Sequence, residues 1–390
     1  MSDDFRTPFL AADAPQVPYN GQAFVTDDVD CLTSETRVIE IPRHFDFLDY
    51  LYLEIDWIHG SDLSTSFNQG HALIDYVDLL AGSDILVRET GASLYLRTLI
   101  TDARPGAWDS PGHGINALLG GRNWKDLSVY PRTAEKPYTL RVPLLFFFFG
   151  KTPFPLCALR FHELAVRVRF RKSDVFLASD PGKELSMVIR LRMEGGYLDD
   201  ARREAFLSRG HDYVMDEFHI FEYDTKGDRE DIIRPDFFNP SKALFFTCQD
   251  SVFLKSDDLF NYARDNTRVE RDLFKSVKVV VQGNVVGDHE VLTHDFARTS
   301  QFHYSYPGGP RLDLNALVYA LNFCMRPLEL QPTAHLLLND CQIEVKTNLP
   351  LLRGLLRNTV RVTVYSLGIN VVRVQGGFAK KLWSSPKNWR

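Results

Sequence analysis

Hydrophobic and polar residues alternate with a period of two along much of the chain. At residues 51–57, leucine, isoleucine and tryptophan alternate with tyrosine, glutamate and aspartate, and at 166–171 valine and phenylalanine alternate with arginines. This period places one face of a strand in a core and the other in solvent. It also predicts strands at 187–192, 342–346 and 360–364. Two less alternating apolar runs, Val277–Val281 and Leu144–Phe149, predict strands that are covered on both faces.

Helical signals are few, and the clearest one lies near the middle of the chain. The segment Asp199–Gly210 begins with two aspartates, continues with good helix formers and ends in glycine. A second short helix is expected at Ser256–Tyr262. Because a single core stops growing at about 250–300 residues, a chain of 390 residues favours two domains joined by the central helix.

The predicted organisation is all-β, with few short helices and no evident sequence repeat between the two halves. Its parts are an N-terminal arm at 1–32, a first sandwich at 33–198, a helical connector at 199–212, a second sandwich at 213–375 and a basic C-terminal tail at 376–390. Periodicity alone does not separate an eight-stranded jelly roll from an immunoglobulin-like sandwich.

Composition supports the all-β assignment and narrows the class of function. The 28 phenylalanines and 15 tyrosines favour strands, and the net charge of −6 argues against a surface dedicated to nucleic acid. Five scattered cysteines without a CxxC motif suggest free thiols in a reducing compartment. We see no signal-peptide pattern and no apolar run long enough to span a bilayer, so synthesis in a cytosol is expected.

Several short motifs approach a catalytic or metal-binding pattern and fail. Residues 162–166 (HELAV) start like a zinc-protease helix, but the last of them would have to be histidine, and the stretch alternates like a strand. Gly150-Lys151-Thr152 resembles the end of a phosphate loop, but position 145 is leucine where that loop needs glycine. The Gly112-His113-Gly114 segment indicates only a loop. We therefore expect that the protein is not an enzyme and that it has no catalytic, cofactor-binding or metal-ligating residues and no cofactor. His162 and Glu163 are expected to have structural roles.

The order of several longer segments is more informative. The longest is Leu140–Phe170, where an aromatic-rich strand and a proline-containing loop lead into FPLCALRFHE. The other segments are Ile41–Arg43 (IPR), Gly70–Ile85 (GHALIDYVDLLAGSDI), Leu198–Asp216, Phe237–Phe246 (FFNPSKALFF), Val281–Asn284, Tyr319–Thr333, Val364–Asn370 and Gly376–Ala379. In this order they resemble the major capsid proteins of nucleocytoplasmic large DNA viruses. The chain is short for that family, and it has Asn239-Pro240 where the family has N-H-P.

The resemblance implies a double jelly roll of two tandem eight-stranded domains and a structural, non-enzymatic role. It implies a homotrimer that forms a pseudo-hexagonal capsomer of an icosahedral virion and is assembled in the host cytoplasm. The implied partners are the chain itself, neighbouring capsomers and minor capsid proteins, with no specific nucleic acid. A transient scaffold of the poxvirus type and a minor capsid protein stay open as alternatives, and a glycan-binding or carbohydrate-active jelly roll is a weaker one. The aromatic run Phe146–Phe149 fits either the core or, in part, a contact with a partner subunit.

The C-terminal tail combines positive charge with tryptophan. Lys380, Lys381, Lys387 and Arg390 lie in a segment without acidic residues, interleaved with Trp383 and Trp389. One interpretation is a solvated chain end. The alternative is a contact with a neighbouring subunit or a minor capsid protein, which we rank above an internal membrane because four charges at about 1 kcal/mol each bind lipid weakly.

Overall fold

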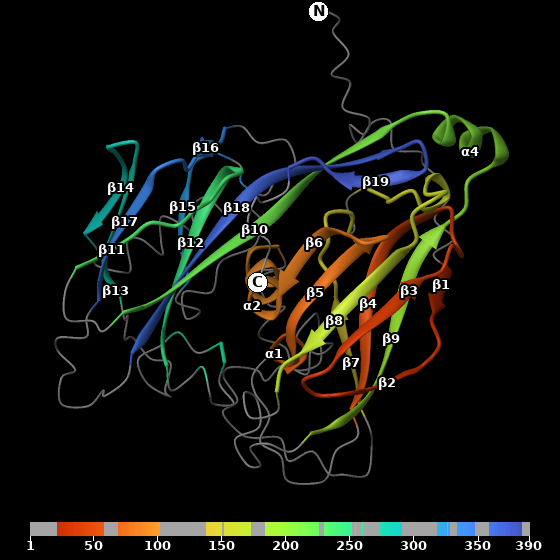
Figure 1. Cartoon of the computed structure of the whole chain (residues 1–390), viewed down its shortest axis with the longest axis horizontal. Helices are drawn as coiled ribbons and strands as arrows, with labels where there is room; N and C mark the ends of the chain where they lie inside the picture. Colours follow the sequence, from red (N-terminus) through yellow and green to blue (C-terminus); the bar gives the residue numbers. More distant parts are fainter. Residues whose placement is uncertain are drawn as a thin grey trace, which may run out of the picture.

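Four antiparallel sheets contain most of the described residues in the computed structural model shown in Figure 1. The structure describes residues 22–57, 69–101, 138–149, 152–172, 184–225, 230–251, 254, 259–260, 262, 274–290, 318–325, 327, 334–347 and 359–383. Within these ranges no helix is both long and apolar enough to cross a membrane.

The first half of the chain forms two facing sheets. One has the order β1 (Gln22–Val25), β9 (Ser186–Gly196), β4 (Phe47–Trp57) and β7 (Tyr138–Pro143), with β2 (Val29–Leu32) also paired to β9. The other has the order β3 (Thr36–Ile41), β8 (Leu164–Phe170), β5 (Ile74–Ala81) and β6 (Asp84–Thr90). The predicted alternation is confirmed for the apolar face of β4, where Leu51, Leu53 and Ile55 are fully buried; on the opposite face Tyr52 and Asp56 are partly exposed, but Glu54 is buried, paired with Arg141 and Arg190.

The second half repeats this arrangement. One sheet has the order β10 (His211–Thr225), β18 (Val360–Gln375), β12 (Pro240–Asp250) and β15 (Tyr319–Asn322), with β16 (Leu336–Leu337) on β12 and β19 (Phe378–Lys381) on β18. The other has the order β11 (Asp231–Ile233), β17 (Cys341–Thr347), β13 (Phe274–Val281) and β14 (Asn284–Glu290). The order β11-β17-β13-β14 corresponds to β3-β8-β5-β6 of the first half.

The correspondence extends to the register of two hairpins. Both β5–β6 and β13–β14 have a two-residue turn, and the bulge lies between Leu79 and Leu80 in one and between Val279 and Val280 in the other. Next to the turn, Ala81 pairs with Leu164 of β8, and Val281 pairs with Cys341 of β17. The halves therefore share a backbone plan that their sequences do not reveal.

The turns of the two hairpins differ in conformation. In the first, Gly82 has a positive φ of 58°. In the second, both Gln282 (φ 50°) and Gly283 (φ 78°) are left-handed, as a type I′ turn requires. Different turn sequences thus support the same hairpin length.

The aromatic run after β7 is not a strand, which corrects the expectation for residues 144–149. The Leu144 N–H donates to the carbonyl oxygen of Leu51 (2.9 Å), but the chain then turns, and the Phe149 N–H donates to the carbonyl oxygen of Phe146 (2.9 Å). A strand would send successive side chains to opposite faces. The turn instead brings Phe146, Phe147 and Phe148 into the core, which confirms the core interpretation for these three residues.

Helices occupy the connections between strands. The predicted central helix is confirmed as α4 (Asp200–Leu207), and the Asp199 carboxylate caps it by accepting from the Arg202 N–H (2.9 Å). The sequence did not predict α1 (Gln69–Leu73) or α2 (Gly91–Thr101), because the largely buried α2 lacks a clear polar face. The helix expected at Ser256–Tyr262 lies largely outside the described residues. A 3-10 turn, η1 (Leu156–Ala158), precedes β8.

Buried apolar side chains form three clusters. One fills the first sandwich, but it also includes Tyr213 and Met215 of β10 and Val372 and Val374 of β18. A second contains residues from both sheets of the second sandwich and fills its core. The third joins α1 and α2 to β10, β12 and β18, so the two sandwiches pack against each other through a core of their own.

Candidate functional site

The near-miss motifs do not converge on a common site. His162 and Glu163 precede β8 rather than lying in it, and the His162 Nδ1 is 3.1 Å from the carbonyl oxygen of Ala379 in β19. Gly150, Lys151 and residues 112–114 lie outside the described residues. Among those described, no group of three or more potential ligands is placed to hold a metal ion. The most organised arrangement of polar side chains is instead at the junction of the two sandwiches.

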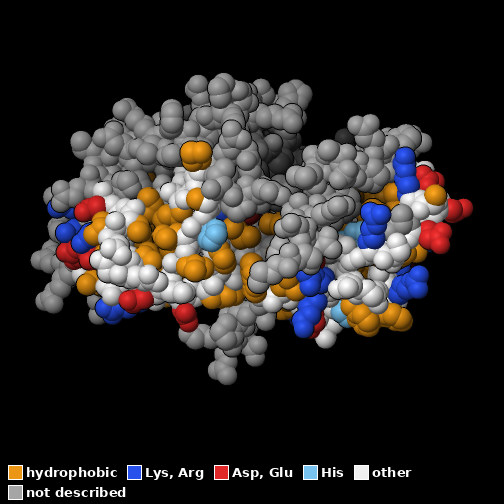
Figure 2. All heavy atoms as spheres, turned by 90° about the horizontal axis from the view of Figure 1, so that it is seen from above, with side chains coloured by type: hydrophobic (Ala, Val, Ile, Leu, Met, Phe, Trp, Pro, Cys, Tyr) orange, Lys and Arg blue, Asp and Glu red, His pale blue; other side chains and the backbone are white. Residues whose placement is uncertain are grey.

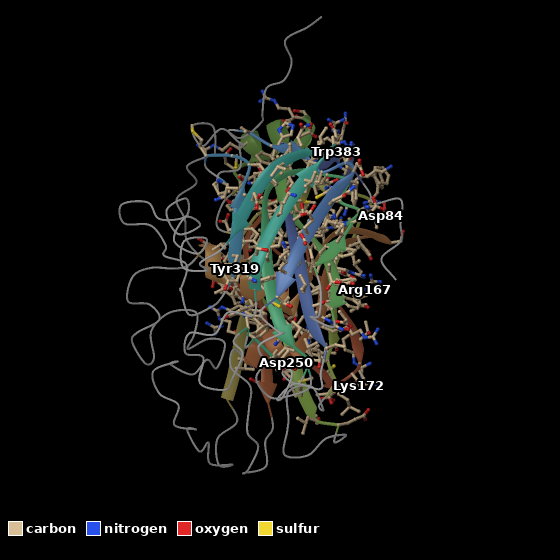
Figure 3. All side chains as sticks on the ribbon, turned by 90° about the vertical axis from the view of Figure 1, so that its left-hand side faces the viewer. Asp84, Arg167, Lys172, Asp250, Tyr319 and Trp383 are labelled. Atoms are coloured by element: carbon tan, nitrogen blue, oxygen red, sulfur yellow. The ribbon has the colours of Figure 1, made fainter. Side chains whose placement is uncertain are left out.

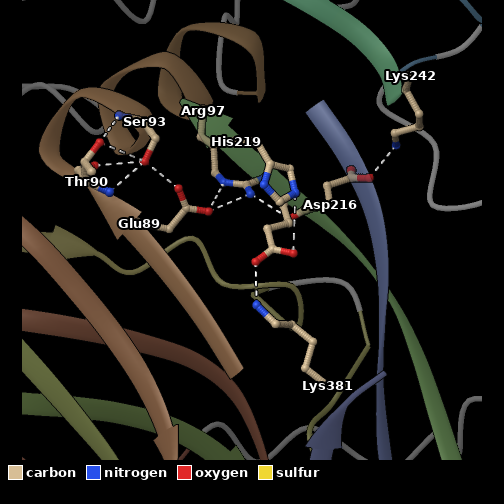
Figure 4. A network of polar contacts seen from close by, with 9 residues as sticks. Glu89, Thr90, Ser93, Arg97, Asp216, His219, Lys242 and Lys381 are labelled. Carbon is tan, nitrogen blue, oxygen red and sulfur yellow. Dashed lines mark hydrogen bonds and ion pairs between the residues drawn. The ribbon is translucent and has the colours of Figure 1, made fainter. Parts of the chain in front are cut away.

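One half of this junction is centred on Glu89, at the end of β6 (Figure 4). The Arg97 guanidinium on α2 donates from Nε to Glu89 Oε1 (2.7 Å) and from Nη2 to the carbonyl oxygen of Asp216 in β10 (2.7 Å). The Ser93 hydroxyl donates to Glu89 Oε2 (2.5 Å). Burial raises the pKa of Glu89, while Arg97 and Ser93 oppose this by stabilising the carboxylate. Arg97 thus connects the first sandwich to a backbone carbonyl of the second.

The other half is centred on Glu217, one residue further along β10. The Lys381 ammonium of β19 lies 2.7 Å from Glu217 Oε1, and the Asn370 amide of β18 donates to Glu217 Oε2 (2.7 Å). The neighbouring Asp216 forms a separate buried ion pair with Lys242 of β12, at 2.6 Å. Burial lowers the pKa of the nearby His219, which favours its neutral form. These contacts connect three strands of the second sandwich to the junction.

An apolar seam lies beside these ion pairs. The ring of Tyr95 on α2 stacks on that of Phe260, with centroids 4.4 Å apart. His71 on α1 is fully buried in this region, and neither ring nitrogen has a hydrogen-bond partner among the described residues. Burial lowers the pKa of His71 to about 3. Burial without a hydrogen-bond partner therefore favours the neutral form of His71 at neutral pH.

Strand β19 fastens the second sandwich to the loop that precedes β8. The Phe161 N–H donates to the carbonyl oxygen of Gly377 (3.0 Å), and the His162 ring contacts Ala379. Gly377 has a φ of 91°, and a Cβ there would lie 2.7 Å from the Phe161 ring. The first part of the segment expected to be a basic tail is thus an ordered strand, and Lys381 is paired. Lys387, Trp389 and Arg390 lie outside the described residues.

Apolar side chains are exposed next to this strand. Phe161 and Phe378 stack with ring centroids 5.1 Å apart and keep 68% and 47% of their surface exposed, and Trp383 keeps 45%. Seen from the side on which β19 and α4 lie, hydrophobic side chains form a broad central band between charged ends (Figure 2). Exposed apolar area of this kind is typical of a surface that contacts another molecule.

Sequence reasoning missed the junction network. A signal was present, since Lys242 interrupts a largely apolar strand, and Asp216 and Glu217 are adjacent in β10, where alternation puts one of any two neighbours on the covered face. A charge in a buried strand needs a partner, but the sequence does not say which distant residue supplies it.

Comparisons with known proteins identify the fold. No family model matches the chain. Capsid protein 1 of Acanthamoeba polyphaga mimivirus is 25% identical over 217 residues, a match that covers 52% of this chain and only about a third (34%) of that relative. The resemblance to capsid proteins that the motifs predicted is thus confirmed by a sequence match over about half of the chain.

Solved structures extend the likeness to nearly the whole chain. The PBCV-1 virus capsid model matches with a TM-score of 0.72 and 14% identity, covering 94% of this chain and 98% of that chain. The Faustovirus major capsid protein has a TM-score of 0.61 and 10% identity, with 90% of each chain covered. The mavirus major capsid protein has a TM-score of 0.55 and 10% identity, with 94% and 93% covered. The predicted double jelly roll is confirmed as the fold.

Proposed function

We propose that this chain is a major capsid protein, a non-enzymatic building block of the icosahedral shell of a large DNA virus. The observation that carries the proposal is the double jelly roll shared over 94% of the chain with the PBCV-1 capsid protein. The partial sequence match to a mimivirus capsid protein supports the same assignment. We also infer that the protein is made in the host cytoplasm and ends in the virion.

The junction suits such a role because a shell protein has to transmit load between its two domains. A third apolar cluster and the hydrogen bond from Arg97 to the carbonyl oxygen of Asp216 join the sandwiches, and the ion pairs of Glu89 and Glu217 brace this junction from either side, so we expect the two sandwiches to move as one block. Stiff blocks with repeated, individually weak contacts favour reversible and accurate assembly. The domain boundaries that we propose place α4 between the sandwiches.

We further propose that three copies form a closed trimer, in which six sandwiches give a pseudo-hexagonal capsomer. Light scattering of the purified full-length protein should give about 134 kDa, three times the 44.7 kDa of one chain. Negative-stain electron microscopy should show pseudo-hexagonal particles or lattice sheets. A stable monomer at micromolar concentration, with no lattice under any assembly condition, would contradict the proposal.

The apolar surface around Phe378 and Trp383 is the proposed contact with a neighbouring subunit or a minor capsid protein. Lys381 is already paired with Glu217, so the tail's other positive charges are Lys380, which is exposed, and Lys387 and Arg390 in the segment 384–390, which also carries Trp389. Three positive charges are too few to hold a membrane alone, at about 1 kcal/mol each. We therefore place a protein partner above lipid.

Deletion of residues 384–390 tests this contact without removing β19. The trimer should keep its mass and melting temperature, while the yield of assembled particles should fall severalfold. A double variant, Lys387→Gln with Arg390→Gln, keeps Trp389 and separates charge from aromatic contact. Normal assembly of the deletion variant would show that these residues are a solvated chain end.

A further inference from the structure

A cavity of about 380 Å³ lies where β8 ends, at the edge of the first sandwich. Its volume falls within the range of about 300–1,000 Å³ that is typical of small-molecule sites. Figure 3 places Lys172 at the end of the molecule opposite Trp383, so the cavity is far from the apolar surface beside β19. The lining residues are Ser34, Asp75, Arg169, Phe170, Arg171 and Lys172. Three of these side chains are cationic, and Asp75 is the one carboxylate among them.

Arg171 is the residue that makes this cavity unusual. Its Nε donates to the carbonyl oxygen of Ile74 (3.0 Å), but no carboxylate lies within ion-pair distance of its guanidinium in the described part of the chain. Two residues earlier, Arg169 has Asp75 at 3.5 Å, and Arg167 has Asp78. Desolvation lowers the pKa of Arg171 despite the more distant carboxylates of Asp75 and Glu222. A desolvated cation of this kind is stabilised by an anion placed beside it.

Two other lining residues, Asp75 and Ser34, also bear on anion binding. Asp75 is 43% exposed and its ion pair with Arg169 is long, so a stronger anion can compete for that guanidinium. Ser34 has a left-handed φ of 71° in the β2–β3 turn, a conformation that a non-glycine residue adopts at some cost. The Ser34 N–H donates to the carbonyl oxygen of Arg171 (3.1 Å), which fixes the turn against the end of β8. The wall of the cavity is therefore held in place before any ligand arrives.

We propose that this cavity binds a compact oxyanion of the phosphate or sulfate class. The guanidinium groups of Arg171 and Arg169 would donate charge-assisted hydrogen bonds to its oxygens, and the Lys172 ammonium would add a third positive charge at the mouth. Guanidinium groups match the geometry of tetrahedral oxyanions, and such bonds are roughly twice as strong as neutral ones. The proposal stands independently of the role in a capsid.

Isothermal titration calorimetry tests the proposal on the full-length protein, with inorganic phosphate or sodium sulfate in a chloride buffer of constant ionic strength. The wild-type protein should show saturable binding at one site per chain. Arg171→Gln should weaken binding by about tenfold or more, since it removes a charge-assisted contact. Asp75→Asn should tighten binding, because it removes the competing carboxylate.

Two further variants keep the test decisive. Lys172→Gln changes an exposed side chain, so it should fold normally and still weaken binding severalfold even if Arg171→Gln does not fold. Arg373→Gln removes the same charge from an exposed ion pair with Asp212 and should bind like the wild type.

Phosphate binding without sulfate binding would identify the ligand as a phosphate group, and equal binding would show selection for the tetrahedral oxyanion. The absence of saturable heat with either anion, or equal affinity in the Lys172→Gln, Arg373→Gln and wild-type proteins, would overturn the proposal.

Discussion

The β5–β6 and β13–β14 hairpins carry an ionic triplet at the same position, but with every charge reversed. In the first sandwich, Asp78 lies between two arginines: Arg88 Nε is 2.6 Å from its Oδ1, and Arg167 Nη2 is 2.5 Å from its Oδ2. In the second sandwich, the corresponding residue is a cation, Lys278. It pairs with Glu344 (3.1 Å) and lies opposite Asp288 on β14.

The two triplets differ most in burial. The Asp78 side chain is fully buried, whereas that of Lys278 is 34% exposed. The Arg88 guanidinium also lies over the Tyr76 ring, 4.3 Å from its centroid. The comparison teaches that the sheet register fixes where opposite charges must meet, while the sign of each charge is free. How much a triplet contributes to stability depends on its exposure to water.

The largest effect is expected at the buried triplet. Asp78→Ala leaves two arginines beside a desolvated site, so it should lower the free energy of unfolding by about 3–5 kcal/mol. Urea denaturation followed by circular dichroism measures this change. The matched control is Lys278→Ala, at the corresponding position of the other hairpin. Equal losses in the two variants would contradict the importance of burial.

Burial should also govern how the free energy of unfolding depends on pH, and His71 tests this most directly. Burial lowers the pKa of His71 to about 3 from an ordinary value near 6.5, so between these values the unfolded chain binds a proton that the folded chain does not. The contribution of neutral His71 to the free energy of unfolding is therefore fully present above about pH 6.5. Below that pH this contribution falls by about 1.4 kcal/mol per pH unit, so that about 2 kcal/mol is lost at pH 5.

Denaturation curves at pH 7.5 and pH 5.0 measure this loss. His71→Leu removes the titrating group and fills the same apolar region. The free energies of unfolding of this variant at the two pH values should therefore differ by about 2 kcal/mol less than those of the wild type. Carboxylates elsewhere contribute equally to both proteins and cancel in the comparison. An unchanged pH dependence in the variant would show that His71 gains a partner when it is protonated.

The smallest effects are expected at the exposed triplet. Lys278→Ala should lower the free energy of unfolding far less than Asp78→Ala, because exposed ion pairs contribute little. Lys278→Asp should cost more than Lys278→Ala, since it faces Glu344 and Asp288 with a like charge. The double variant Lys278→Asp with Glu344→Arg should recover part of that loss, measured as a coupling free energy in a double-mutant cycle. If the losses of the two single variants simply add in the double variant, residues 278 and 344 are not coupled, and the prediction is contradicted.

The sequence predicted those parts of the fold that are determined locally. Alternation in β4, β8 and β17 marked the buried faces, and the aspartates at the start of α4 marked its first turn. It was wrong at Leu144–Phe149, because an apolar run does not say whether the chain extends or turns. The two hairpins share almost no side chains at equivalent positions, so their common register was not visible before the structure.

The junction was the least predictable part. Arg97 meets Asp216 across 119 positions of sequence, and Lys381 meets Glu217 across 164. Alternation reports which face of a strand is buried but not which distant strand covers it. The motifs that resemble capsid proteins supplied the overall arrangement, and the polar contacts at the junction came only from the structure.

The length of the β10–β18 pair has a consequence for how the protein is made. These strands pair from Thr225 and Val360 at one end to His211 and Val374 at the other, and Val372, Val374 and Ala379 end inside the first apolar cluster. The first sandwich therefore cannot complete its apolar core until β18 and β19, which come much later in the chain, have been translated. Contacts over such long separations slow folding and leave apolar surface exposed meanwhile. The need for a chaperone is thus greatest before strands β18 and β19 have been synthesised.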